Sequence, residues 1–231
     1  MLTTSNLDLF YGKSQILFDI NLSASIGQVT CVLGTNGVGK TSLMRAIAGA
    51  HPISAGTIHL DGQEITRSAP YQRAKSGIAY VPQGRDIFPL LSVEENLETG
   101  YSCLPADHHF IPDSIFEMFP VLDQMRRRKG GDLSGGQQQQ LAIARALITQ
   151  PKVLILDEPT EGIQPNIIAQ IGEVIQKLKD QGDMAIVLVE QYFDFAYKLA
   201  DKFYTLKRGA VTLDATKSAT SRDEVLANVT V

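Results

Sequence analysis

Residues 34–41 carry the glycines and side chains needed to bind a chain of phosphates. The segment reads Gly34-Thr35-Asn36-Gly37-Val38-Gly39-Lys40-Thr41 and follows the pattern G-x-x-x-x-G-K-[ST]. Its glycines allow positive φ angles and bring backbone N–H groups close to phosphate oxygens, because no Cβ blocks the approach. The Lys40 ammonium suits the β- and γ-phosphates, and the Thr41 hydroxyl suits Mg²⁺. The residues predicted to bind a nucleotide here are Gly34, Asn36, Gly37, Val38, Gly39, Lys40, Thr41 and Ser42.

Two carboxylates follow an apolar run later in the chain. Residues 153–156 are all apolar and lead directly into Asp157 and Glu158. Because the carboxyl ends of parallel strands meet at one edge of a sheet, we expect both carboxylates to lie near Lys40. Asp157 would hold Mg²⁺, and Glu158 would orient or deprotonate the water that attacks the γ-phosphate. The alternative is an aspartate that caps a helix beside a surface glutamate.

The elements around the glycine-rich segment are those that the motif requires. The largely apolar run at residues 29–33 predicts a strand at 28–33 before it, and the apolar periodicity of residues 42–48 predicts a helix after it. A glycine turn that merely joins the two is the alternative, and it would not need the complete pattern. Other predicted strands are 2–10, 16–23, 56–60, 78–81, 153–158, 185–189 and 202–206, with helices at 166–178 and 192–200. This alternation predicts an α/β fold in which an N-terminal antiparallel piece precedes a parallel-sheet core.

Helical periodicity replaces the strand pattern in the middle of the chain. Ser92 and Glu95 form an S-x-x-E capping box, and the helical pattern continues with interruptions to about Met125. Residues 134–137 have the related S-x-x-Q form and begin a helix that ends before Pro151. We expect one domain of residues 1–231. In it, residues 92–149 form an inserted α-helical lobe, and residues 1–91 and 150–231 form the catalytic core.

Composition narrows the class of protein. The chain has 231 residues, 44% of them hydrophobic and 20% charged, with a net charge of -4. This negative charge argues against nucleic-acid partners, and no stretch approaches the ~20 apolar residues of a membrane span. Cys31 and Cys103 form no C-x-x-C pair, so a metal or redox role is not expected. We expect a globular protein that stays in the cytosol.

The order of these motifs carries a family resemblance. The phosphate-binding loop, Gln83, Leu133-Ser134-Gly135-Gly136-Gln137 and Asp157-Glu158-Pro159-Thr160 together resemble the ATP-binding cassette of an ABC transporter. The L-S-G-G-Q signature is the specific part, since a phosphate-binding loop alone also occurs in kinases, GTPases and helicases. The resemblance covers nearly the whole chain. It implies a P-loop NTPase fold, ATP and Mg²⁺ as cofactors, and ATP hydrolysis as the activity.

The resemblance also implies roles for further residues. Ser134, Gly135, Gly136 and Gln137 of the signature would contact ATP held by a second cassette, so the working unit would be a head-to-tail dimer. Tyr11 would stack on adenine, although an ordinary aromatic at a strand end is the alternative. Gln83 would touch Mg²⁺ or water and report to the membrane subunits.

Two positions depart from the general cassette pattern. Gln164 stands where an aspartate is usual after the Asp-Glu-Pro-Thr block, and Gln191 stands where a histidine usually senses the γ-phosphate. We expect Gln191 to take over the hydrogen bonds of that histidine, so the catalytic residues would be Glu158, Gln191 and Lys40. A surface glutamine at a strand-to-helix junction is the alternative.

The residues at these two positions resemble those found in ATPase subunits of the branched-chain amino-acid and urea importers. Within that group, residues 81–89, 130–132, 137–140 and 161–165 most resemble the ATP-binding E component of urea importers. We therefore expect urea or a short amide as the solute, with a branched-chain amino acid as the alternative. The resemblance implies a different second ATPase chain, two integral membrane permeases, a periplasmic solute-binding protein as an indirect partner, and a position on the cytoplasmic face of the inner membrane.

Two other classes of function stay open. A soluble cassette protein that acts on DNA or ribosomes usually has a long coiled coil or tandem cassettes, and this chain shows neither. A small-molecule P-loop kinase would leave the signature and Gln83 without a role. A kinase would accumulate a phosphorylated product without releasing free phosphate, whereas an ATPase releases phosphate, so a phosphate assay would distinguish the two.

Overall fold

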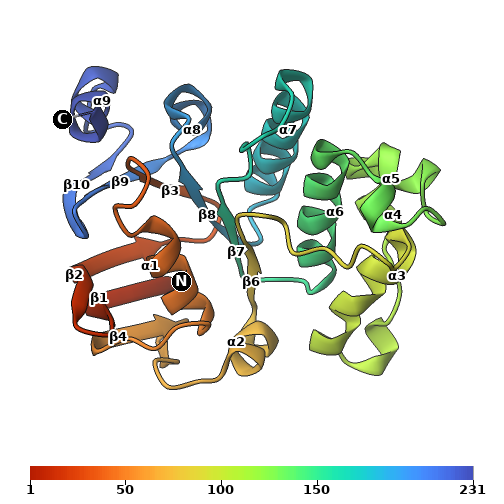
Figure 1. Cartoon of the computed structure of the whole chain (residues 1–231), viewed down its shortest axis with the longest axis horizontal. Helices are drawn as coiled ribbons and strands as arrows, with labels where there is room; N and C mark the ends of the chain where they lie inside the picture. Colours follow the sequence, from red (N-terminus) through yellow and green to blue (C-terminus); the bar gives the residue numbers. More distant parts are fainter. Residues whose placement is uncertain (231) are drawn as a thin grey trace.

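A largely parallel sheet forms the centre of the computed structural model, which describes residues 1–230 (Figure 1). Its strand order is β10 (Ala210–Thr216), β9 (Lys202–Lys207), β3 (Val29–Leu33), β8 (Ala185–Glu190), β7 (Val153–Asp157) and β6 (Ile78–Val81). Neighbouring strands from β9 to β6 are parallel, whereas β10 pairs with β9 in the antiparallel direction. The predicted parallel-sheet core is confirmed.

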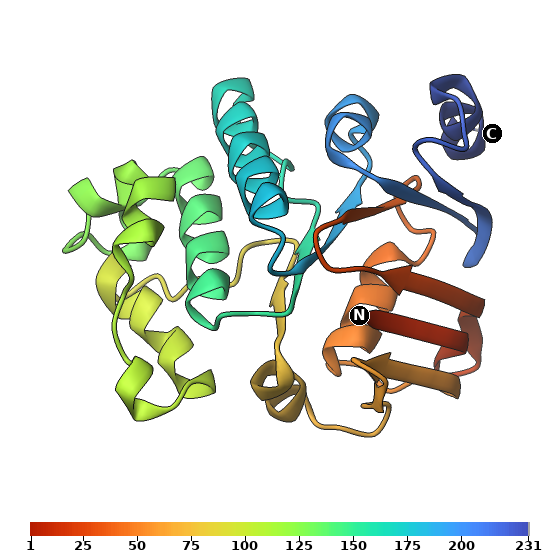
Figure 2. The same ribbon diagram turned by 180° about the vertical axis from the view of Figure 1, so that it is seen from behind.

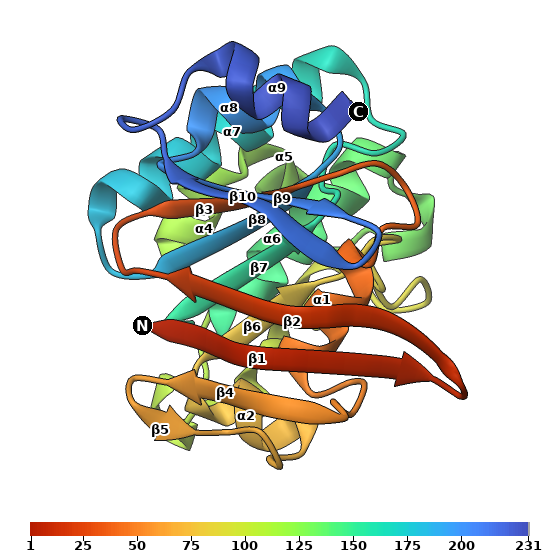
Figure 3. The ribbon, with the colours of Figure 1, turned by 90° about the vertical axis from the view of Figure 1, so that its left-hand side faces the viewer.

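A second, antiparallel sheet is built from the N-terminal part of the chain (Figure 3). Its order is β2 (Ser14–Ala24), β1 (Leu2–Tyr11), β4 (Ala55–Leu60) and β5 (Gln63–Glu64). Helix α1 (Lys40–Ala48) packs between this sheet and one face of the central sheet, because Leu43, Met44 and Ile47 share a buried cluster with residues of both. The predicted N-terminal antiparallel piece is therefore confirmed.

Besides α9 (Arg222–Thr230), which packs against β9, three helices cover the opposite face of the central sheet. They are α6 (Gly135–Ile148), α7 (Pro165–Gln181) and α8 (Phe193–Leu199), and Figure 2 shows α6 and α7 side by side. Alternate residues of the central strands serve the two faces: Val32 packs toward α1, and Cys31 and Leu33 pack toward these helices. Coverage on both faces explains why these strands are continuous apolar runs.

The lobe beside α6 consists of short helices. They are α3 (Val93–Glu98), η1 (Thr99–Cys103), η2 (Ala106–His108), α4 (Asp113–Met118), α5 (Pro120–Gln124) and η3 (Gly130–Asp132). Both predicted capping boxes are present: the Ser92 hydroxyl accepts from Glu95 N at 3.2 Å, and the Ser134 hydroxyl accepts from Gln137 N at 3.3 Å. Each box satisfies backbone N–H groups that the first turn leaves without a helical partner.

Four elements were not predicted: α2 (Pro70–Ser76), α9 (Arg222–Thr230), β5 and β10. Helix α2 buries only Arg73, so it has no apolar stripe to reveal it. Strand β10 lies at the edge of the sheet and is half exposed, which weakens its apolar pattern. Within the described part of the chain, no helix combines the length and apolar character that a membrane span needs.

Strand register brings the ends of the central strands to one edge of the sheet. Leu33 is aligned with Glu190, and Asp157 is aligned with Val189. On the other side of β7, Val81 of β6 is aligned with Leu156. The segments that follow these strands therefore all leave the sheet at the same edge, as expected for a site built at the carboxyl ends of parallel strands.

Candidate active site

The glycine-rich segment connects β3 to α1 through backbone that only glycine fits easily. Gly39 has φ 108°, and a Cβ added there would lie 2.7 Å from Leu17 Cδ2. A Cβ on Gly34 would lie 2.6 Å from the Leu206 carbonyl oxygen. Helix α1 then begins at Lys40, so its free N–H groups and the positive end of its dipole face the loop. This is a phosphate-binding geometry.

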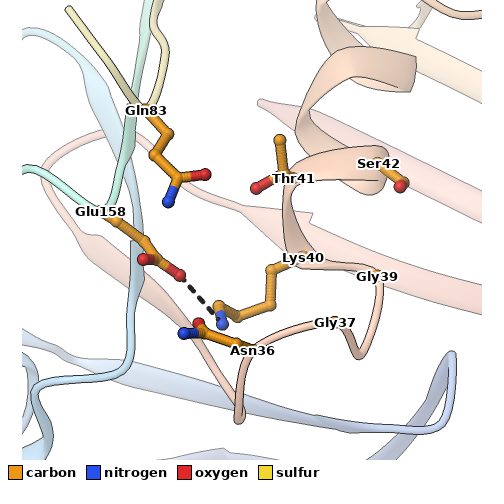
Figure 4. Close-up of a pocket in the computed structure, with 8 residues that line it drawn as sticks. All are labelled: Asn36, Gly37, Gly39, Lys40, Thr41, Ser42, Gln83 and Glu158. Atoms are coloured by element: carbon orange, nitrogen blue, oxygen red, sulfur yellow. Dashed lines mark ion pairs between the residues drawn. The ribbon is translucent and has the colours of Figure 1, made fainter.

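A cavity of about 250 Å³ opens over this loop (Figure 4). The residues that line it are Asn36, Gly37, Gly39, Lys40, Thr41, Ser42, Gln83 and Glu158. In Figure 4 the side chains of Gln83, Glu158, Lys40 and Thr41 point toward one another, and the Ser42 hydroxyl points away from them. The loop and a carboxylate from the end of β7 therefore share one space, as the sequence predicted.

Lys40 and Glu158 form a buried ion pair at this cavity. The distance from Lys40 Nζ to Glu158 Oε1 is 3.1 Å, and the two side chains are 3% and 4% exposed. Lys40 Nζ also donates to the carbonyl oxygens of Gly34 at 2.8 Å and Thr35 at 3.0 Å. The ammonium thus has three oxygen partners, which compensate its removal from water. The charge that would hold a γ-phosphate is the same charge that neutralises Glu158.

Glu158 stands in a constrained turn that a second strand supports. Its φ is 49°, in the left-handed region, and its N–H donates to the Val189 carbonyl at 2.9 Å. Gln191 Nε2 donates to Glu158 Oε2 at 3.3 Å. Glu158 therefore accepts from Lys40 on one oxygen and from Gln191 on the other. The structure places the glutamine that was expected to replace the usual histidine directly against this carboxylate.

Asp157 lies one residue earlier and is held by two hydroxyl groups. Thr41 Oγ1 donates to its Oδ1 at 3.4 Å, and the Tyr80 hydroxyl donates to its Oδ2 at 3.0 Å. Burial raises the pKa of this carboxyl group above its ordinary value, and the two hydroxyl hydrogen bonds oppose that shift. Burial and the neighbouring Asp157 likewise raise the pKa of Tyr80, so its hydroxyl stays a donor.

The oxygen atoms around Asp157 and Thr41 are of the kind that coordinates Mg²⁺. Thr41 and Asp157 supply a hydroxyl and a carboxylate oxygen beside the phosphate-binding loop, and Mg²⁺ prefers oxygen ligands of this kind. Gln83 lines the same cavity, and its amide oxygen faces Thr41 in Figure 4. Its Nε2 donates to Glu161 Oε2 at 2.9 Å, which fixes the side chain in this orientation.

Several predicted residues are not part of the cavity lining: Gly34, Val38, Asp157 and Gln191 belong to the loop and strand ends beside it, and Tyr11 and the signature are also absent from it. The Tyr11 ring is 41% exposed at the end of β1 and packs edge-on against His51, with 4.4 Å between ring centroids. Ser134 caps α6, and neither it nor the following signature residues 135–137 belong to the lining found among residues 1–230. The chain by itself therefore does not bring the signature to its own phosphate-binding loop.

Three polar residues of the site were not predicted from the sequence. Tyr80 holds Asp157, Glu161 holds Gln83, and Glu190 accepts hydrogen bonds from segments after β7 and β8. Glu190 and Tyr80 had a detectable signal, because each is a polar or amphipathic residue at or near the end of an apolar strand next to a predicted site residue. Glu161 sits in a loop, where spacing alone does not indicate its partner.

Comparison with known sequences gives a consistent result. A family model described as ABC transporter matches residues 17–161. BraG of Pseudomonas aeruginosa, a high-affinity branched-chain amino acid transport ATP-binding protein, is 38% identical over 220 residues, covering 95% of this chain and 94% of that protein. LivF of Archaeoglobus fulgidus, a probable branched-chain amino acid transport ATP-binding protein, is 39% identical over 217 residues, covering 94% and 92%.

Solved structures show the same fold. A nucleotide-free ATP-binding cassette from an ABC transporter superposes with a TM-score of 0.85 and 26% identity, covering 98% of this chain and 95% of that one. A cassette in its ADP conformation superposes with a TM-score of 0.84 and 26% identity, covering 98% and 94%. The predicted cassette fold, with its inserted helical lobe and N-terminal antiparallel piece, is confirmed.

Proposed function

Because the chain belongs to the ABC transporter family, as an ATP-hydrolysing subunit of an importer, we propose that the solute it helps to import is a branched-chain amino acid. The observation that carries this proposal is the similarity to BraG and LivF along almost the full length of all three chains. The motifs of the sequence had favoured urea. The relatives support the alternative better, so urea is retained here only as the competing outcome of the test.

We propose that Lys40, Glu158 and Gln191 are the catalytic residues. Lys40 would bind the γ-phosphate and stabilise the charge that develops on it. Glu158 would accept a proton from the attacking water, or orient that water, on the carboxylate oxygen that ATP frees by drawing Lys40 away. Gln191 would hold Glu158 through its 3.3 Å hydrogen bond and donate toward the phosphate.

ATP would lie on the backbone of residues 34–39 and on the start of α1, with Tyr11 stacked on its adenine. Mg²⁺ would be held by Thr41, Asp157 and Gln83, which supply the oxygen ligands that it prefers. When bound, Mg²⁺ neutralises part of the phosphate charge. The Tyr80 hydrogen bond to Asp157 would keep the carboxylate oriented toward this position.

The signature at the start of α6 would serve the ATP of a second cassette. Its position outside the cavity lining of its own chain supports this proposal. Cassettes of this family work as dimers with membrane permease subunits. We propose a head-to-tail dimer with a different ATPase chain, two permeases, an indirect periplasmic binding protein and a location on the cytoplasmic face of the membrane. Residues 1–231 would form one cassette, with the helical lobe at about 92–149.

Solute uptake by cells that lack this chain tests the proposal. Initial uptake of radiolabelled leucine and of radiolabelled urea is compared after complementation with wild-type protein or Glu158→Gln. We expect leucine uptake to be lost, restored by wild type and not by the variant, while urea uptake is unchanged. Loss of urea uptake with normal leucine uptake would overturn the assigned solute and reinstate urea.

A further inference from the structure

Glu190 is a buried carboxylate that no step of the proposed reaction uses. It is the last residue of β8, and it is 1% exposed. Among the described residues its partners are N–H and O–H donors, not a cation. Burying an ionised carboxylate costs several kcal/mol of folding free energy unless its oxygens accept enough hydrogen bonds, so the partners of Glu190 determine whether the site is stable.

The two oxygens of Glu190 bind two different segments. Oε1 accepts from Thr160 N at 3.2 Å and from Thr160 Oγ1 at 2.8 Å, two residues after Glu158. Oε2 accepts from Gln191 N at 3.1 Å and from Tyr192 N at 3.2 Å, in the turn between β8 and α8. One carboxylate thus joins the segment after β7 to the segment after β8.

These two segments adjoin two of the proposed catalytic residues, Glu158 and Gln191. Both the backbone and the side chain of Glu158 are hydrogen-bonded to β8 or to the residue that follows it. The Glu158 N–H donates to Val189 O at 2.9 Å, and its Oε2 accepts from Gln191 Nε2 at 3.3 Å. The Gln191–Glu158 contact is long for a hydrogen bond, so a small shift of either segment would break it. Glu190 fixes the backbone on both sides of that contact.

We propose that Glu190 is a positioning residue, whose carboxylate clamps Thr160 to the Gln191–Tyr192 turn and thereby sets the contact between Gln191 and Glu158. This inference rests on the proposed roles of Gln191 and Glu158 in hydrolysis. The ionised form fits the clamp best, because all four partners are donors and a protonated carboxyl would bring a fifth. Burial raises the pKa of Glu190 above its ordinary value, and the hydrogen bonds from Thr160, Tyr192 and Gln191 oppose that shift.

Glu190→Gln tests the clamp because the amide has nearly the same shape but only one acceptor oxygen. If its NH₂ group faces Thr160, the Thr160 N–H loses its acceptor, although the hydroxyl can rotate and accept from the NH₂ group. If the NH₂ group faces the Gln191–Tyr192 turn, both N–H groups there lose their acceptor. We expect hydrogen exchange of the purified full chain to rise by about tenfold or more at the amides of that side. Thr160→Val, which removes only the hydroxyl donor, should show a smaller rise. Glu173→Gln, on the exposed face of α7, is the matched control and should show none.

The kinetic arm uses a double-mutant cycle with Gln191→Ala. Alone, Glu190→Gln should lower the ATP turnover number by about tenfold or more and change ATP affinity little. In the Gln191→Ala background the same change should cost less than about threefold, because the contact that it positions is already absent. A merely structural glutamate would give the same cost in both backgrounds.

Each result decides between the alternatives. Unchanged exchange at residues 160, 191 and 192 in Glu190→Gln would overturn the clamp, whether or not the protein hydrolyses ATP. Faster hydrogen exchange in Glu190→Gln, together with an equal loss of ATP turnover in the wild-type and Gln191→Ala backgrounds, would overturn the positioning role. A wild-type chain without ATP hydrolysis would defeat the proposed function instead, and the exchange measurement would still decide whether the clamp exists.

Discussion

The Lys40 ammonium lies 3.1 Å from the Glu158 carboxylate, and both side chains are almost completely buried. In the proposed mechanism, this one cation would pair first with the carboxylate and then with the phosphate chain of ATP. Binding of ATP would draw the ammonium toward phosphate and weaken its hold on Glu158, which would make that carboxylate a better proton acceptor. Nucleotide binding and activation of the base are then consequences of the same movement of charge.

Lys40→Ala should abolish tight ATP binding, with a loss of affinity of about 100-fold. It should also lower the free energy of unfolding by about 3 kcal/mol, because Glu158 stays buried without its ion-pair partner. Calorimetric titration with ATP and urea denaturation measure the two effects. The exposed Lys177→Ala on α7 is the control. Tight ATP binding by Lys40→Ala would show that the loop backbone alone holds the phosphates.

Gln191→Ala should reduce ATP turnover by about 100-fold and leave ATP affinity nearly unchanged, because the lost hydrogen bond acts on Glu158 and on the developing phosphate charge. Gln191→His keeps a ring N–H donor and should retain activity, with a new pH dependence between about pH 6 and pH 7. Steady-state hydrolysis by the assembled transporter is the measurement. A Gln191→Ala enzyme as fast as wild type would leave Gln191 as a structural residue.

Asp157→Asn should not lower the free energy of unfolding at about pH 7, although it should abolish Mg²⁺-dependent ATP binding. Burial raises the pKa of Asp157 in the folded protein, so its ionised form opposes folding. This penalty is absent below the ordinary aspartate pKa, grows as the pH rises through the raised pKa, and is constant above it. Urea denaturation should therefore show a variant that gains stability over wild type at about pH 7 and loses that gain at about pH 4. A variant that is less stable than wild type at both pH values would contradict this argument.

Ser134→Arg should stop hydrolysis at the partner's ATP without reducing ATP binding by this chain. Ser134 lies at the start of α6, outside the cavity over the phosphate-binding loop, so the bulky side chain would block only the approach of a second cassette. Nucleotide titration of the isolated chain and hydrolysis by the assembled transporter separate the two effects. An equal loss of ATP affinity in the isolated chain would place the signature at its own site.

Much of this site could be predicted from the sequence because the conformation of its loop, strands and helix starts is determined by residues close together in the chain. The loop needs glycines at fixed positions, the buried strands need unbroken apolar runs, and Ser92 and Ser134 mark helix starts through short-range hydrogen bonds. Parallel strand register then brings Gly34 and Asp157 to one edge without further information. These features depend on neighbours in the chain or on a general rule of sheet topology.

Sheet topology predicts that Lys40 and Glu158 lie near each other, but the specific bonding partners of the polar groups depend on contacts between residues distant in the chain. The Lys40–Glu158 ion pair and the Gln83–Glu161 hydrogen bond join segments that are 118 and 78 residues apart, and no periodicity reports such a pair. The clamp of Glu190 on Thr160 is of the same kind. The expected solute, urea, is supported less well by the relatives than the alternative, because that expectation rested on family resemblance alone and on no solute-binding site.

Glu158→Gln is the most direct test of the account, because it keeps the shape of the side chain and removes only its charge. Lys40 then has no carboxylate to neutralise, so ATP should bind at least as tightly as to wild type, while the amide cannot accept the proton of the attacking water. Turnover of ATP and the dissociation constant of ATP are measured on the same preparation of wild type and variant. The account predicts a fall in turnover of about 100-fold or more with undiminished ATP affinity. Hydrolysis at the wild-type rate by Glu158→Gln would contradict it.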